Sequence, residues 1–177
     1  MGHIRIATER TVFAMPECSI GIVPDIGACY FLPQLPGKLG LFLGVTGTRM
    51  TGWECRKYGL ATHYIRSEHV DHVLESLTSI TSPDLRSISQ VLVEKETGQP
   101  IEKRSDYLSE NLDEINGAFN SQTYSEVIQK LKANKNSFSE ETLSKISSSS
   151  PTSQALTFKQ LSLATGSYKE ALEIDFR

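Results

Sequence analysis

Glycine and proline are concentrated in the first third of the chain, and this asymmetry constrains the fold more than any other feature. Nine of the twelve glycines and four of the seven prolines fall within residues 1–60 of the 177. Both residue types serve tight turns and close backbone contacts, so this part is expected to be rich in loops and closely packed. The remainder is rich in Ser, Glu and Lys and has helical periodicity. The sequence therefore predicts two regions, residues 1–66 and residues 67–177.

The predicted strands and helices of the first region are short. Strands are expected twice within residues 3–15 and once at 63–65, and helices at 28–32, 38–45 and 51–58. Thr51 is suited to cap the last of these helices, and Gly59 is suited to end it. Short strands between buried helices predict an α/β fold class.

Residues 67–177 show the spacing of amphipathic helices. A helix capped by Ser67 is expected first, because apolar residues recur at intervals of three and four, at Val70, Val73, Leu74 and Leu77. Further helices are expected at 84–94, 107–119, 124–131, 140–146 and 152–164, the last with Pro151 at its start. A final helix from Tyr168 meets no glycine or other breaker by Arg177, which predicts truncation.

Charge and composition argue against several classes of protein. The 18 basic and 21 acidic side chains give a net charge of −3 without long runs of one sign, so nucleic-acid binding is not expected. No apolar stretch approaches the roughly 20 residues that span a membrane. The first residues show no targeting peptide. Three cysteines without a C-x-x-C pair predict free thiols instead of a zinc or redox site; they are Cys18, Cys29 and Cys55.

Two carboxylates in apolar surroundings are the strongest candidates for chemistry. Glu17 and Asp25 each directly follow a proline, which fixes φ and gives each acid a stiff backbone corner. Apolar surroundings raise a carboxyl pKa and so suit a base or a proton donor near neutral pH. The residues alone leave alternatives open, because such acids also cap helices or lie in surface turns. Asp25 in particular is placed to cap a helix that runs through Tyr30.

A longer motif around these acids resembles a known superfamily. A strand is followed by Met-Pro-Glu, then by Gly-Ile-Val-Pro-Asp-Ile-Gly, and then by a Tyr-Phe-Leu-Pro helix. This order resembles the C-terminal part of the crotonase (enoyl-CoA hydratase/isomerase) superfamily. Within the superfamily it is closest to the 3-hydroxyisobutyryl-CoA hydrolase family, in which the Asp follows the Glu by eight residues. Further matches cover the rest of the chain, at Leu32-Pro33, Gly37–Gly40, Thr46-Gly47, Gly59–His63 and Ser150–Ser153.

The resemblance implies both a fold and an activity. Residues 1–66 would be the end of a crotonase-like ββα spiral, and residues 67–177 a helical region. The implied activity is hydrolysis of a 3-hydroxyacyl-CoA thioester in valine breakdown. Glu17 would act as carboxylate nucleophile or as base to a water, and Asp25 would bind the substrate hydroxyl or assist proton transfer. Gly27 joins the two acids in the implied substrate site.

The resemblance also implies partners and a location. No cofactor is expected, because CoA is part of the acyl-CoA substrate. The helices of this region make trimer contacts or cover a neighbouring site in the superfamily, which implies a homo-oligomer as one arrangement of the chain. The implied location is the mitochondrial matrix.

Two features depart from the family pattern. Crotonases stabilise an oxyanion with two backbone N–H groups, and the resemblance places both upstream of the segment present here, with the strands that grip the CoA nucleotide. This chain alone is therefore expected to be a poor catalyst. The family's Gly-Gly-Gly after the Asp is Gly27-Ala28-Cys29 here, which predicts a narrower acyl pocket or a diverged activity.

Two other functions compete with the hydrolase. One is a non-catalytic crotonase-like scaffold subunit associated with mitochondrial ribosomes, and the other is a further crotonase activity such as enoyl-CoA hydratase. Retention of both acids and an isoelectric point near 5.8 favour the hydrolase over the scaffold.

Overall fold

The chain forms two compact units in the computed structural model, which describes residues 2–81, 84–96, 106–163 and 166–175. One, here called the strand unit, comprises residues 1–13 and 50–105, and the other, here called the helical unit, comprises residues 14–49 and 106–177. The units interleave along the sequence, so they do not coincide with the predicted division at residue 66. That division followed composition, whereas residues 14–49 pack with helices that come after residue 106. Residues 164, 176 and 177, in two predicted helices, lie outside the described residues.

Two pairs of very short strands organise the strand unit. β1 (Ile6–Ala7) pairs in parallel with β4 (His63–Tyr64), and β2 (Val12–Phe13) pairs antiparallel with β3 (Met50–Thr51). The strands predicted within residues 3–15 and at 63–65 are thus present, but each is only two residues long.

Helix α3 (Gly52–Lys57) follows β3 and begins as the sequence predicts. The Thr51 hydroxyl accepts a hydrogen bond from the N–H of Glu54, while the Glu54 carboxylate accepts one from the N–H of Thr51 at 2.7 Å. This reciprocal capping box satisfies two backbone donors at the helix start. The helix ends just before Gly59, whose φ of +84° a glycine adopts without strain.

Helices α4 (Val70–Thr78) and α5 (Leu85–Lys95) form a hairpin within the strand unit, with the short 3-10 helix η3 (Ser67–His69) leading into α4. Val73 and Leu92 pack with Ile65 in a small buried cluster. Leu74, which the periodicity assigns to the apolar side of α4, is 54% exposed.

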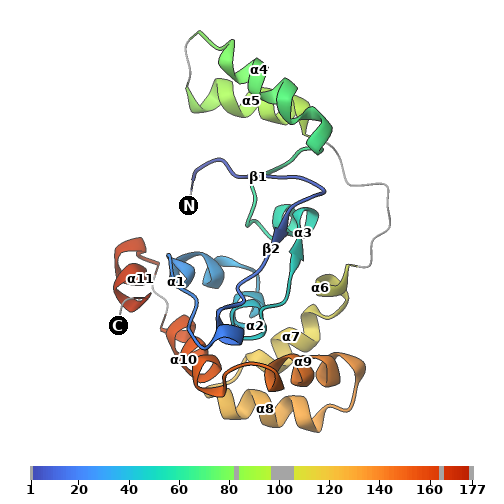
Figure 1. The fold of residues 1–177 in the computed structure, drawn as a ribbon, viewed down its shortest axis with the longest axis vertical. Helices are drawn as coiled ribbons and strands as arrows, with labels where there is room; N and C mark the ends of the chain where they lie inside the picture. Colours follow the sequence, from blue (N-terminus) through green and yellow to red (C-terminus); the bar gives the residue numbers. More distant parts are fainter. Residues whose placement is uncertain (1, 82–83, 97–105, 164–165, 176–177) are drawn as a thin grey trace. The chain divides into compact units, whose positions relative to one another are not determined.

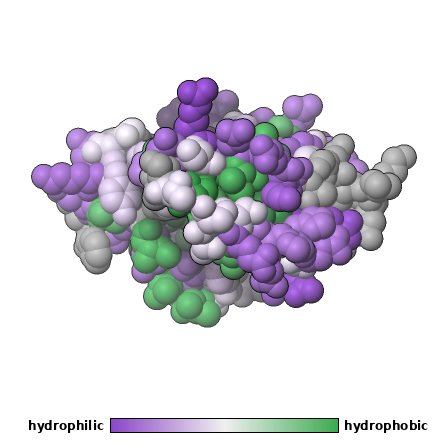
Figure 2. Space-filling view, turned by 90° about the horizontal axis from the view of Figure 1, so that it is seen from above, coloured by the Kyte–Doolittle hydropathy of each residue, from purple (hydrophilic) through white to green (hydrophobic). Residues whose placement is uncertain are grey.

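The surface seen in Figure 2 is mostly hydrophilic, with smaller hydrophobic groups between the polar residues.

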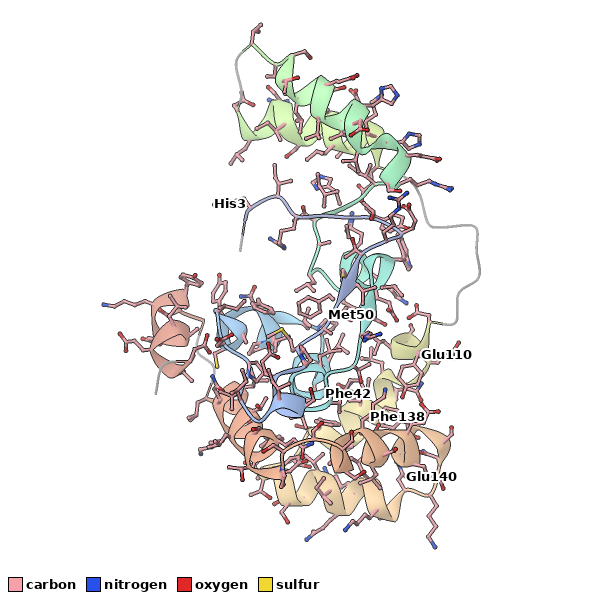
Figure 3. All side chains as sticks on the ribbon, in the orientation of Figure 1. His3, Phe42, Met50, Glu110, Phe138 and Glu140 are labelled. Atoms are coloured by element: carbon pink, nitrogen blue, oxygen red, sulfur yellow. The ribbon has the colours of Figure 1, made fainter. Side chains whose placement is uncertain are left out.

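Helix α2 (Leu39–Thr46) is the centre of the helical unit. It contacts α7 (Leu112–Phe119), α9 (Ser137–Ser147) and α10 (Pro151–Ser162), and the antiparallel pair of α8 (Tyr124–Ala133) and α9 closes one side (Figure 1). Phe42 of α2 lies edge-on to Phe119, with 5.5 Å between ring centroids. Its ring is also 5.8 Å from that of Phe138, with the two planes tilted by 35° (Figure 3). The prediction that residues 38–45 form a buried apolar helix is confirmed, since Phe42 and most of its neighbours in α2 are fully buried.

The remaining elements of the helical unit are short. They are the 3-10 helix η1 (Glu17–Ile20), α1 (Ala28–Phe31), the 3-10 helix η2 (Leu32–Gln34), α6 (Tyr107–Glu110) and α11 (Tyr168–Asp175). The prediction of a single helix over residues 107–119 is wrong, because the helix is interrupted at Asn111, which separates α6 from α7. Within the described ranges, no helix has the length and apolar character needed to cross a membrane.

Candidate active site

Glu17 begins the 3-10 helix η1, and the next residue in this helix contacts two helices of the core. The neighbouring Cys18 is buried, with its Sγ 3.5 Å from the Gly44 carbonyl oxygen of α2 and 3.3 Å from the Thr157 hydroxyl of α10. Gly21 ends the turn with a φ of +85°, a conformation that favours glycine. The position of the Glu17 corner is therefore held by the packing of Cys18 against α2 and α10.

The Glu17 carboxyl is half-buried, and one of its oxygens is isolated. Within the described part of the chain, Oε2 is buried and has no hydrogen-bond partner. Burial raises the pKa of Glu17 above its usual range, and the negative charge of Asp25 adds to this increase, while a hydrogen bond to its own backbone opposes it. An unsatisfied buried polar group costs about 1–3 kcal/mol. This carboxyl is thus poised to accept a proton or to engage a ligand.

Asp25 occupies the second proline corner and differs from Glu17 in exposure. Pro24 is buried, whereas Asp25 is exposed to solvent. Its charge acts on Glu17, so the structure brings the two predicted acids into one electrostatic environment. The alternative that Asp25 caps a helix is wrong, because Gly27 is the N-cap of α1 and no side chain caps that helix.

The backbone beyond Asp25 takes an uncommon course. Ile26 has a φ of +50° and is the one non-glycine residue with positive φ in the described part of the chain. For a residue with a Cβ this left-handed conformation costs roughly 1–2 kcal/mol. Gly27 follows with a φ of +91°. Two consecutive left-handed residues turn the chain sharply from the Asp25 corner into α1.

Gly27, the third predicted site residue, is buried and already engaged. Its N–H donates to Oδ2 of Asp175 at 2.6 Å. A Cβ at this position would lie 3.4 Å from the Tyr168 ring. The N–H is therefore used within the protein, and a contribution of Gly27 to substrate binding stays a prediction.

The two side chains that replace family glycines lie inside the protein. Ala28 and Cys29 are fully buried, and all three cysteines are free and buried, as predicted. Burial raises the pKa of the Cys29 thiol well above its ordinary value, and the nearby Asp175 carboxylate raises it further. Cys29 is therefore a protonated packing residue at neutral pH.

Sequence analysis missed two residues at the site, Gln160 and Asp175, which contact the loop between Pro24 and Gly27. It also missed Lys145, which lines a pocket of about 140 Å³ and whose Nζ lies 5.4 Å from the centroid of the Tyr107 ring. This pocket adjoins η1 and is lined by Pro16, Cys18, Ser19, Thr46, Gly47, Lys145, Ser148 and Ser149. One local signal was available for Asp175: an acid in the last turn of a helix, where it opposes the helix dipole.

The ionisable side chains of the site suit acid–base chemistry. Among the described residues, His, Cys, Asp and Glu do not gather into a group of three or more that would hold a metal ion. The carboxyls of Glu17 and Asp25 are the acidic groups at the two corners, one partly desolvated and one exposed. Such a pair can divide proton transfer and ligand binding between its members.

Comparison with known proteins identifies relatives of the chain. The profile of the enoyl-CoA hydratase/isomerase family matches residues 1–177. The mitochondrial 3-hydroxyisobutyryl-CoA hydrolases of Xenopus laevis and Homo sapiens are each 40% identical to the chain over 178 residues. These alignments cover 99% of this chain and 46% of each relative. The chain thus spans about half the length of the curated relatives it matches.

Solved structures share the fold. A carnitinyl-CoA dehydratase from Mycobacterium thermoresistibile matches with a TM-score of 0.85 at 26% identity, over 99% of this chain and 49% of that chain. An enoyl-CoA hydratase from Rhodobacter sphaeroides 2.4.1 matches with a TM-score of 0.80 at 27% identity, over 99% and 48%. The predicted fold class, the C-terminal part of a crotonase-like α/β fold, is confirmed. The chain belongs to the enoyl-CoA hydratase/isomerase family.

Proposed function

We propose that this chain carries the acid pair of an acyl-CoA thioester hydrolase that acts on 3-hydroxyisobutyryl-CoA. The observation that supports this most directly is the Glu17 carboxyl, whose Oε2 is buried without a partner among the described residues. A desolvated carboxyl of raised pKa is a stronger base and nucleophile than a solvated one. The substrate is suggested by the hydrolases that share 40% of their aligned residues with the chain.

Glu17 would act at the thioester carbonyl by one of two routes. As a base, it takes a proton from water, the water oxygen bonds to the carbonyl carbon, and the C–S bond breaks to release CoA as its thiol after protonation. As a nucleophile, its own oxygen displaces CoA and water then hydrolyses the resulting anhydride. Both routes consume one water and yield the free acid and CoA.

Asp25 would bind the hydroxyl of the acyl group. An ionised carboxylate offers only acceptor oxygens, so it pairs with a hydroxyl donor. Asp25 is exposed, and its charge already acts on Glu17. A substrate hydroxyl held by Asp25 would therefore place the reacting carbonyl beside Glu17.

The proposed reaction needs no cofactor, since CoA enters as part of the substrate. The relatives named above are mitochondrial, and we extend this location and a role in valine breakdown to the present protein. Because the chain spans about half of those relatives, we expect it to hydrolyse the thioester slowly by itself.

The test is release of CoA thiol from 3-hydroxyisobutyryl-CoA by two forms of the protein. One form is this chain, and the other is a chimera in which the N-terminal part of the Xenopus laevis hydrolase precedes it. Each is compared with Glu17→Gln and with Glu140→Gln, a matched change at an exposed glutamate on α9 (Figure 3).

We expect the chimera to turn over, Glu140→Gln to match it, and Glu17→Gln to lose the activity. A folded chimera that releases no thiol would contradict the hydrolase proposal. Hydration of an enoyl-CoA by the same chimera, without thioester cleavage, would instead identify it as a hydratase, the activity of one of its structural neighbours.

A further inference from the structure

Two side chains from the C-terminal helices hold the backbone on both sides of Asp25. Asp175, the last residue of α11, accepts the N–H of Gly27 at 2.6 Å through Oδ2. Gln160 of α10 donates from Nε2 to the Pro24 carbonyl oxygen at 3.2 Å and to Oδ1 of Asp175 at 3.1 Å. We call Gln160 and Asp175 the clamp. It binds the carbonyl of Pro24, just before Asp25, and the N–H of Gly27, two residues after it, and the hydrogen bond between Gln160 and Asp175 links these two points.

Helix α11 is held against the same loop by aromatic contacts. The Tyr168 ring lies edge-on to Tyr30 of α1, with centroids 5.4 Å apart and planes at 87°. The position that a Cβ on Gly27 would take is 3.4 Å from Tyr168. Figure 1 shows α11 beside α1, as the contacts require. The first residue of α11 therefore contacts α1, and its last residue contacts the turn that follows Asp25.

The position of Asp175 in its own helix does not explain its presence. The last turn of a helix carries partial negative charge, so a carboxylate there is unfavourable and a basic residue is favoured. The last turn of α11 has no basic residue. Asp175 instead receives hydrogen bonds from the Gly27 N–H and from the Gln160 side chain. Its interactions are directed at the site loop.

The conformation of the loop shows why it needs such support. Ile26, between Asp25 and Gly27, is 79% exposed and has a φ of +50°. Strained conformations of this kind persist only where surrounding contacts over-determine them. An exposed side chain supplies few such contacts, so the restraint must come through the backbone. The clamp provides it at Pro24 and Gly27.

We infer that Asp175, with Gln160, is a positioning residue for Asp25: the clamp holds the strained turn so that the Asp25 carboxylate is presented to the substrate hydroxyl. The functional half of this inference rests on the proposed function. The structural half, restraint of the turn by Asp175, does not depend on any substrate.

The structural half is tested on this chain without substrate, by amide hydrogen exchange of Gly27. Asp175→Ala is compared with Glu170→Ala, which removes an exposed acid from the same helix, and with Asp175→Asn, which keeps an acceptor oxygen. We expect Gly27 to exchange about tenfold faster in Asp175→Ala, as local opening becomes easier. We expect Glu170→Ala to match the wild type and Asp175→Asn to lie between the two.

The functional half is tested in the form of the protein that the thiol-release assay finds active. The ratio of kcat/KM for 3-hydroxyisobutyryl-CoA to that for isobutyryl-CoA measures how well the hydroxyl is used. We expect Asp175→Ala to lower this ratio about tenfold, because a small displacement of a binding group is costly. A variant that merely folds less well would lower kcat/KM for both substrates by the same factor and leave the ratio unchanged.

The outcomes separate the two proposals. Unchanged Gly27 exchange in Asp175→Ala would overturn the clamp, whatever the activity. Faster exchange with an unchanged substrate ratio would restrict Asp175 to a packing role and refute positioning. Faster exchange in a chain and a chimera that are both inactive would support the restraint and reject the hydrolase.

Discussion

At each of the two corners an acid directly follows a proline, but the environments of the two acids are opposite. Pro16-Glu17 opens a 3-10 helix whose next residue, Cys18, is buried against α2 and α10. Pro24-Asp25 leads into an exposed, strained turn that is restrained by the clamp. Core packing thus supports the acid that is partly desolvated, and hydrogen bonds support the acid that is exposed. This difference matches the roles proposed above, in which Glu17 reacts and Asp25 binds the substrate hydroxyl.

The largest expected contrast is in activity. Glu17→Gln removes the proposed reacting group and should lower kcat of the active form about 10³-fold, the range of general acid–base contributions. Asp25→Asn keeps the shape of its side chain and removes only the charge, so we expect a smaller loss of about tenfold, mainly for substrates that carry the 3-hydroxyl. Thiol-release kinetics with both variants measure this contrast. Equal losses of activity in the two variants would show that reaction and substrate recognition are not divided between Glu17 and Asp25.

The packing side of the comparison is tested at Cys18. Cys18→Ala removes the buried Sγ that contacts Gly44 and Thr157, and we expect it to lower the free energy of unfolding by about 1 kcal/mol. Urea unfolding measures the change. Cys55→Ala, at a buried thiol of the strand unit, is the matched control, and we expect it to lower the free energy of unfolding by a similar amount.

The strain at the second corner predicts a change of opposite sign. Ile26→Asn places a residue that tolerates left-handed backbone at a φ of +50°, and little buried surface is lost because Ile26 is 79% exposed. We expect the free energy of unfolding to rise by about 0.5–1 kcal/mol. Ile20→Asn, at a comparably exposed isoleucine, should give no gain. A loss of stability in Ile26→Asn would mean that the turn is not strained in solution.

The smallest expected effect is the dependence of stability on pH. Because burial raises the pKa of Glu17 in the folded state, the folded protein binds this proton more tightly than the unfolded chain does. The resulting penalty is absent below the unfolded pKa of about 4.5, grows as pH rises, and is complete above the folded pKa. Glu17→Gln should therefore raise Tm slightly at pH 7 and leave it unchanged near pH 4. A Tm gain of the same size at both pH values would contradict a raised pKa.

Local sequence was sufficient for the parts of the fold that depend on neighbouring residues. The Thr51 cap follows from the four residues that form it, and the buried α2 follows from its continuous apolar character. The break at Asn111 could not be read from residues 107–119, whose apolar spacing continues through it.

Prediction of the candidate site was also partial. Glu17 and Asp25 were identified from their motif, and the structure places them in one electrostatic environment, while their roles stay predictions. Capping by Asp25 was wrong, because the two left-handed residues after it move the helix start to Gly27. Gln160 and Asp175 escaped prediction since their partners are more than a hundred residues away along the chain.

The hydrogen bond between Gly27 and Asp175 has a consequence for the time at which the site is completed. It joins residues 148 positions apart. At a synthesis rate of about 5–20 residues per second, the Asp25 turn waits at least several seconds for α11 to be made. During this interval the nascent chain holds both acids without their final geometry. Cleavage that removes α11 from the finished protein would return it to this immature state, with Glu17 and Asp25 intact.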